Sequence, residues 1–237
     1  MKKAFFDSEG VLAVFTNRHG GVSKKPFDSL NLAFHVEDDF QDVLRNRKML
    51  LDELRIEKIA WMNQIHSDVI KVIDNEGEVI GCDAIITKRK KLALVTMVAD
   101  CNPILIVDGM KKVIAAVHAG REGTFKRIVQ KTIQKMKDEF GCKEQDLLVS
   151  IGPSIGPCCY EVNKSNIDKV YENFDGKYIV NGKFLDLKTL NFDQLVEAGV
   201  SEERIEVLDE CTCCNKDYFS YRRDGKTGRF AGIIMLK

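Results

Sequence analysis

The stretch VADCNPILIVDGMKKVIAAVHAG, residues 98–120, holds two apolar runs, ILIV and VIAAV, on either side of the turn-forming segment 108–111. This pattern predicts a β-hairpin. A two-residue turn at 109–110 places Cys101 opposite His118, and a turn at 108–109 places the two residues diagonally. Both registers put the two side chains on one face, so a thiol and an imidazole are expected to meet at the open end of the hairpin.

The residues alone leave the chemistry of this pair open. A thiol beside an imidazole is the pattern of a nucleophile and its base. His66, at the end of the apolar segment WMNQIHSDV, adds a second imidazole. One Cys and two His also form a good ligand set for zinc, with the fourth position left for water or substrate. A nucleophilic pair and a metal site therefore remain alternatives, beside simple structural roles for the three side chains.

Composition limits the class of protein. With 237 residues, 44% of them hydrophobic, the chain is expected to form a single domain over residues 1–237. The 36 basic and 36 acidic residues balance, which gives no field that favours nucleic acid or an anionic membrane. Asp100 interrupts the longest apolar run, and Asp7 and Glu9 interrupt any signal-peptide core. We expect a soluble cytoplasmic protein whose cysteines stay reduced.

Short apolar runs typical of strands outnumber helical patterns. Helices are predicted over 40–54, with Phe40, Val43, Leu44, Leu51 and Leu54 on its apolar stripe, and over 124–140, with Thr124 as N-cap and Gly141 as stop. Shorter helices fit 166–174 and 187–199. Strands are expected at 11–15, 59–65, 69–73, 84–87, 92–98, 104–107, 113–117, 147–151, 205–208, 218–222 and 230–236. The fold class is therefore α/β (α+β), with mixed, largely antiparallel sheets.

Six motifs, in order, resemble the YfiH-type "multicopper polyphenol oxidase/laccase-domain" family. They are TNRHGGVSKKPFDSLNL, NQIHSD, ADCNP, VHAG, IGPSIGPCCYEV and FSYRRDGKTGR. The resemblance covers the chain from about residue 10 to its end. It implies a four-layer α-β-β-α sandwich and a mononuclear metal site on His66, Cys101 and His118, with zinc as the metal and copper as the alternative.

The resemblance also implies purine nucleoside chemistry. Its substrates would be purine nucleosides and phosphate: phosphorolysis of adenosine, inosine and S-methyl-5′-thioadenosine, with adenosine deamination as a further activity. A conventional multicopper oxidase is excluded, because it needs many imidazoles and the chain has four histidines. Arg47, Gln64 and Arg223 are the expected substrate-binding residues, the arginines for phosphate. The chain departs from the family at HAGREG, where Arg121 and Glu122 replace Trp and Arg.

Two other functions remain. A Cys/His pair on a similar fold occurs in the cytotoxic necrotising factor toxins, so Cys101 and His118 could form a cysteine-nucleophile hydrolase or deamidase. A metal- or purine-binding sensor without turnover is the non-enzymatic alternative. The cysteines of CC at 158–159 and of CTCC at 211–214 are expected to be packed structural thiols, with a second metal or redox site as the alternative, because neither spacing is a usual metal knuckle. The sequence indicates no oligomeric state.

Overall fold

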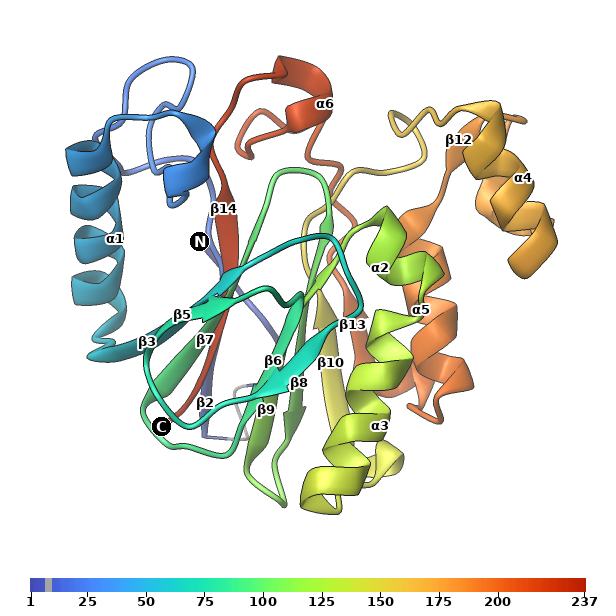
Figure 1. The fold of residues 1–237 in the computed structure, drawn as a ribbon, viewed down its shortest axis with the longest axis horizontal. Helices are drawn as coiled ribbons and strands as arrows, with labels where there is room; N and C mark the ends of the chain where they lie inside the picture. Colours follow the sequence, from blue (N-terminus) through green and yellow to red (C-terminus); the bar gives the residue numbers. More distant parts are fainter. Residues whose placement is uncertain (7–9) are drawn as a thin grey trace.

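Strands with both faces buried build the centre of this protein. The computed structural model describes residues 1–6 and 10–237, and within them the chain forms two mixed, mainly antiparallel six-stranded sheets (Figure 1). The first sheet has the order β1 (Lys2–Lys3), β2 (Val11–Phe15), β14 (Phe230–Leu236), β7 (Leu92–Val98), β3 (Lys58–Asn63), β5 (Gly77–Ile80). The second has the order β13 (Ile205–Val207), β10 (Leu147–Ile151), β8 (Asn102–Asp108), β9 (Val113–Ala119), β6 (Ala84–Thr87), β4 (Ile70–Val72). A short ribbon pairs β11 (Ile179–Val180) with β12 (Phe184–Leu185).

Helix α1 (Phe40–Leu54) covers the outer face of the first sheet, and α3 (Ile128–Phe140) with α5 (Leu187–Glu197) covers that of the second. The other helices of the described chain are α2 (Arg121–Phe125), α4 (Lys164–Asn173) and α6 (Tyr221–Asp224). Four 3-10 turns lie at Phe34–Val36, Glu144–Asp146, Gly176–Tyr178 and Glu202–Arg204 of the described chain. Figure 1 shows α1 on one side of the strands and α3 with α5 on the other. No helix among residues 1–6 and 10–237 is long and apolar enough to cross a membrane.

The core follows from the alternation of side chains along each strand. On β8, Leu105 and Val107 point into the core between the two sheets, whereas Ile104 and Ile106 point outward to the core shared with α3 and α5. Leu50 of α1 packs in a third core on the outer face of the first sheet. Burial on both faces explains the continuous apolar runs in the sequence. The predicted α-β-β-α layering is confirmed.

The hairpin of β8 and β9 is present, but its predicted turn is wrong. Pro103 pairs with His118 and Asp108 pairs with Val113, so residues 109–112 form the connection. The Asp108 carboxylate accepts hydrogen bonds from the backbone amides of Met110 (3.0 Å) and Lys111 (2.8 Å), which stabilises this longer turn. Cys101 thus lies just before β8, two residues from the partner of His118, and the shared face of the two side chains is retained.

Three helical expectations need correction. The helix predicted over 124–140 is divided into α2 and α3 at Arg127, whose φ is 62°. Thr124 is not an N-cap, because its hydroxyl bonds to the Asn191 side chain of α5, and the N-cap of α2 is Gly120. Phe40 and Leu44 are exposed rather than on the buried face of α1. The strand predicted at 218–222 is instead a loop leading into α6, where Ser220 caps the amide of Arg223.

Candidate metal centre

Three segments that are distant in sequence bring His66, Cys101 and His118 together. His66 lies in the loop after β3, Cys101 in the connection from β7 to β8, and His118 near the end of β9. One donor atom from each lies within 4.8 Å of the others. The two imidazole rings meet edge to face with centroids 4.8 Å apart. His118 is buried, Cys101 is half-buried and His66 is exposed, so the group opens toward solvent on the His66 side.

Asp83 holds the His118 ring and the His66 backbone in place through its carboxylate. Its side chain is fully buried, and Oδ1 accepts hydrogen bonds from His118 Nδ1 (2.8 Å) and from the His66 backbone amide (3.0 Å). Oδ2 accepts from the amide and hydroxyl of Ser67 at 2.6 and 2.7 Å. The bond to Nδ1 leaves Nε2 of His118 for the Cys101 side. A carboxylate that orients a ligand imidazole in this way is the usual outer partner of a metal-binding histidine.

The three groups also set one another's charge. Burial opposes ionisation of Cys101, but the charge of His118 and hydrogen bonds from both imidazoles outweigh it and lower the pKa of the thiol to about 6. Burial likewise opposes the charged form of His118, yet Cys101 and Asp83 raise the pKa of His118 to about 9. Despite burial, the bonds from His118 and Ser67 lower the pKa of Asp83 to about 2. Cys101 is therefore held as a thiolate, which is the form of cysteine that binds a metal cation.

Gly120 leaves space between the three donors. A Cβ at this position would lie 3.1 Å from Cys101 Sγ, 3.2 Å from His66 Cδ2 and 3.6 Å from His118 Cε1. The backbone φ of Gly120 is −75°, so its lack of a side chain provides room rather than a special conformation. Two imidazoles and a thiolate around a gap of this kind fit a tetrahedral zinc ion with one open position.

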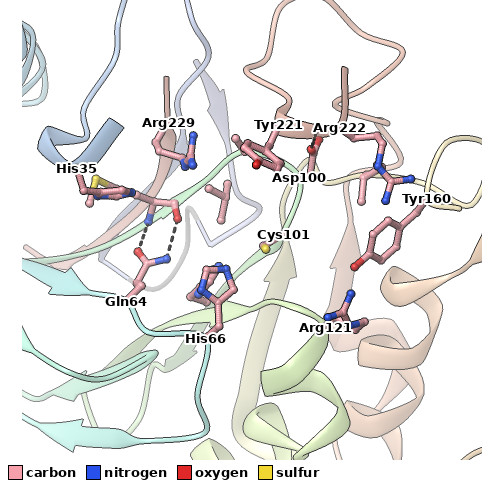
Figure 2. A pocket seen from close by; sticks show the side chains of 15 residues that line it. His35, Gln64, His66, Asp100, Cys101, Arg121, Tyr160, Tyr221, Arg222 and Arg229 are labelled. Atoms are coloured by element: carbon pink, nitrogen blue, oxygen red, sulfur yellow. Dashed lines mark hydrogen bonds between the residues drawn. The ribbon is translucent and has the colours of Figure 1, made fainter. Parts of the chain in front are cut away.

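The group opens into a cavity of about 410 Å³ (Figure 2). Arg121, Arg222 and Arg229 line it together with two tyrosines, Tyr160 and Tyr221. In Figure 2, Arg229 lies on one side of Cys101, and Arg121, Tyr160 and Arg222 lie on the other. The volume is in the range of small-molecule sites, and three guanidinium groups make the cavity attractive to an anion.

The residues predicted to bind substrate are placed differently from one another. Gln64 lines the cavity, but its amide donates to the Met97 carbonyl and accepts from the Met97 amide, both at 2.8 Å. Arg47 lines an adjoining cavity of about 560 Å³, with its guanidinium 3.8 Å from the Trp61 ring centroid and 4.2 Å from that of Phe34. Arg223 does not line either cavity.

The guanidinium of Arg223 donates hydrogen bonds to backbone carbonyls of a neighbouring loop. Nη1 donates to the carbonyls of Thr212 (2.8 Å), Cys213 (3.2 Å) and Asn215 (3.3 Å), and Nη2 donates to the carbonyl of Tyr218 (2.8 Å). Its neighbour Arg222 extends to the cavity instead. The short helix α6 therefore turns Arg222, and not the predicted Arg223, toward the cavity.

Asp83 was missed by reasoning from sequence. A signal existed, because CDAIIT places one acidic residue directly before a fully apolar strand that pairs with β9. An acid entering a buried strand needs hydrogen-bond partners, and His118 lies on that neighbouring strand. Tyr160 and Arg229 were missed as well, and only the fold brings them to the cavity.

A mixed α/β sandwich with a cluster of two histidines and one cysteine at the strand ends defines the class of protein. The family profile described as "Multi-copper polyphenol oxidoreductase laccase" matches residues 12–237, and the chain belongs to this family. A purine nucleoside phosphorylase of Corynebacterium glutamicum is 40% identical over 235 residues, covering 95% of this chain and 94% of the relative. Purine nucleoside phosphorylase YlmD of Bacillus subtilis is 32% identical, covering 98% and 90%.

Solved structures agree with this assignment. The crystal structure of the hypothetical protein YfiH from Bacillus licheniformis has a TM-score of 0.93 and 34% identity, covering 98% of this chain and 94% of that one. YlmD from Geobacillus stearothermophilus has a TM-score of 0.91 and 34% identity, covering 96% and 92%. The predicted resemblance and fold class are confirmed.

Proposed function

We propose that this protein is a purine nucleoside phosphorylase that cleaves adenosine, inosine and S-methyl-5′-thioadenosine and also deaminates adenosine. One observation carries the proposal: His66, Cys101 and His118 open into the same cavity as three arginines. A cavity with cations and aromatic walls suits a phosphate ion beside a purine nucleoside. The names of the relatives, purine nucleoside phosphorylases at 32–40% identity, support the same activity.

His66, Cys101 and His118 would hold the metal, zinc by preference and copper as the alternative. When bound, zinc supplies a Lewis acid that lowers the pKa of water to ~7. Asp83 keeps the His118 ring in one orientation and tautomer through the bond to Nδ1. Four histidines in the whole chain are too few for the several copper centres of a conventional multicopper oxidase.

In phosphorolysis, a phosphate oxygen bonds to the ribose C1′ while the C1′–N9 bond breaks. The purine leaves with the bonding electrons and takes up a proton from water. Binding both reactants in one cavity supplies most of the rate gain, and cations stabilise the attacking anion. Arg222 is held toward the cavity by a 3.0 Å bond from Nη1 to the Cys159 carbonyl. Arg121, paired with Glu122 at 3.1 Å, takes the place of the arginine that the family carries one position later.

In deamination, water adds to C6 of adenosine and ammonia leaves, giving inosine. The purine would then have to lie with C6 toward His66, the exposed member of the ligand group. Phosphorolysis instead needs C1′ near the arginines. Tyr160 and Tyr221 can flank the purine ring in either pose, because both line the cavity.

The predicted substrate-binding residues keep distinct proposed roles. Gln64 fixes the Met97 wall of the cavity and presents its outer edge to the nucleoside. Arg47, held between two aromatic rings, adds positive charge where the two cavities adjoin; they share His35, Gln64 and Met97. Arg223 acts on phosphate only through the loop that it organises around Arg222. We propose that the enzyme works in the cytoplasm on these small molecules, without nucleic acid or membrane partners.

A second candidate is a cysteine hydrolase or deamidase. The observation that favours it is the chain of contacts from Cys101 through His118 to Asp83, which has the order nucleophile, base and orienting acid. His66 argues for the metal, because a cysteine nucleophile needs no third donor within 4.8 Å. A sensor that binds nucleoside without turnover would use the same cavity.

The test is incubation of the purified chain with inosine and phosphate, followed by phosphorus NMR and by measurement of bound metal. The proposal predicts ribose 1-phosphate and hypoxanthine in equal amounts, with a rate that rises with phosphate. Metal-loaded protein that forms no ribose 1-phosphate at any phosphate concentration would overturn it. Amide hydrolysis by metal-free protein, abolished by alkylation of Cys101, would establish the hydrolase instead.

A further inference from the structure

A second group of thiols lies outside the candidate metal centre. Cys158 and Cys159, after β10, meet Cys211 and Cys214, after β13, and the four sulfur atoms lie within 4.8 Å of one another. Cys214 Sγ is 3.6 Å from Cys158 Sγ and 3.4 Å from Cys159 Sγ. The sequence favoured packed structural thiols, and the structure adds that two loops place these four side chains at one point.

These separations match a tetrahedral metal centre. With zinc–sulfur bonds of ~2.3 Å, the sulfurs of a four-thiolate site lie roughly 3.8 Å apart. The bonded sulfurs of a disulfide lie ~2.0 Å apart, well below the separations seen here. Sulfur-only tetrahedral surroundings select zinc or iron among the biological metals.

The local backbone explains how adjacent cysteines can share one ion. Residues 157–159 form a turn, closed by a bond from the Cys159 amide to the Gly156 carbonyl at 3.0 Å, and both thiols project toward Cys214. The Gly156 amide donates to Cys211 Sγ at 3.3 Å. An N–H donor aimed at sulfur stabilises a thiolate ligand.

The surroundings compensate for charge and allow entry. Four thiolates around a divalent ion carry a net charge of about −2. The buried Lys188 places its ammonium beside the cluster, donating to the carbonyl of Glu210, the residue before Cys211. Cys158 and Cys214 are exposed, so an ion can reach the group from solvent.

We propose that Cys158, Cys159, Cys211 and Cys214 bind a structural zinc ion, separate from the candidate catalytic metal. Each thiol gives its proton to solvent as its zinc–sulfur bond forms, and no oxidant is needed. The ion joins the loop at 155–160 to the loop at 210–215. This zinc ion does not bind the substrate, so the proposal of a structural zinc site does not depend on the nucleoside chemistry.

The joined loops form one wall of the cavity. Ile155 and Tyr160, on either side of the first cysteine pair, line it. From the second loop, Thr212 donates to Asp100 Oδ1 at 2.7 Å, next to Cys101. Arg222 bonds to the Cys159 carbonyl. The zinc ion would therefore stabilise the positions of Tyr160 and Arg222 without contacting either residue.

The test removes the first site so that the second is measured alone. The His66→Ala/His118→Ala protein, expressed in zinc-supplemented medium and purified with a reductant and no chelator, is expected to retain about one zinc per chain. Its X-ray absorption spectrum is expected to fit four sulfurs at ~2.3 Å and no nitrogen. Loss of activity in this variant does not affect the result.

Neighbouring cysteines supply a matched pair of variants. In the same background, Cys214→Ser is expected to lose the remaining zinc, whereas Cys213→Ser, which is not one of the four, is expected to keep it. If Cys214→Ser fails to fold, the sulfur-only spectrum of its parent still decides the question. A parent protein without zinc, with iron in place of zinc, or with a disulfide by intact mass would overturn the proposal, as would zinc loss in Cys213→Ser.

Discussion

Asp83 holds His118 by two bonds: its carboxylate accepts from Nδ1 at 2.8 Å, and its backbone carbonyl accepts from the His118 amide at 2.7 Å. Asp83 thus extends the pairing of β6 with β9 by one hydrogen bond and also orients the imidazole of His118. The same carboxylate holds the backbone of the His66 loop. Both histidines of the centre therefore depend on one buried acid.

Asp83→Asn is expected to weaken metal binding by about 10- to 100-fold, because the imidazole loses its charged partner. Competition with a zinc chelator measures the change. Ser67→Ala is the matched control: it removes only one bond to Asp83, that of the Ser67 hydroxyl, and is expected to have a smaller effect. Equal metal affinity in Asp83→Asn and the unchanged protein would contradict this role.

Gly120→Ala is expected to reduce bound metal and activity together. The added methyl group would lie 3.1 Å from Cys101 Sγ and occupy the space between the donors. The backbone conformation at this position accepts alanine, so circular dichroism and the melting temperature of metal-free protein are expected to stay near those of the parent. A variant that retains full metal content would show that the ion does not bind in this gap.

Alkylation of metal-free protein tests the charge state of Cys101. Because its pKa is lowered from 9.0 to about 6, the reactive thiolate persists down to mildly acid pH and is lost below it. Iodoacetamide labelling of Cys101, followed by peptide mass spectrometry, is expected to rise with a midpoint near pH 6. Cys82, whose pKa burial raises to about 11, serves as the internal comparison. In His118→Ala the Cys101 midpoint should move toward 9.0.

Arg121→Gln is expected to raise the KM for phosphate roughly 10-fold with little change in the KM for inosine, as for loss of one charge-assisted hydrogen bond. Initial rates at varied phosphate measure it. Arg45→Gln, on the exposed face of α1, is the control for a change in net charge. Equal phosphate KM values in both variants would remove Arg121 from the phosphate site.

Much of the fold could be predicted because its strands have strong local patterns. The segments at 84–87, 92–98 and 147–151 read as continuous apolar runs since both of their faces are buried. The turn at 109–112 could not be predicted, because the Asp108 side chain replaces the glycine geometry that the sequence suggests. The break at Arg127, whose φ is positive, and the bond between Thr124 and the distant Asn191 are not recorded in any local pattern.

The candidate centre was predictable only in part. Cys101 and His118 share a face of the hairpin whenever its connecting loop has an even number of residues. Their proximity was therefore predicted correctly although the turn was not. His66 was a candidate ligand from the residues alone, but its spacing left metal site and nucleophilic pair open until the family resemblance favoured the metal. Asp83 required knowledge of the neighbouring strand. A site on the second group of cysteines ranked behind structural packing because the spacing is unusual, yet the four-thiol cluster arises from two loops whose approach depends on the parallel pairing of β10 with β13.

The most direct test follows both products of adenosine in one experiment. Unchanged protein and Cys101→Ala, each with its metal quantified, are incubated with adenosine with and without phosphate. The account predicts adenine, hypoxanthine and ribose 1-phosphate only with phosphate, inosine as the product without phosphate, and loss of all products in Cys101→Ala together with the metal of that centre. Unchanged product formation by Cys101→Ala lacking that metal would contradict it.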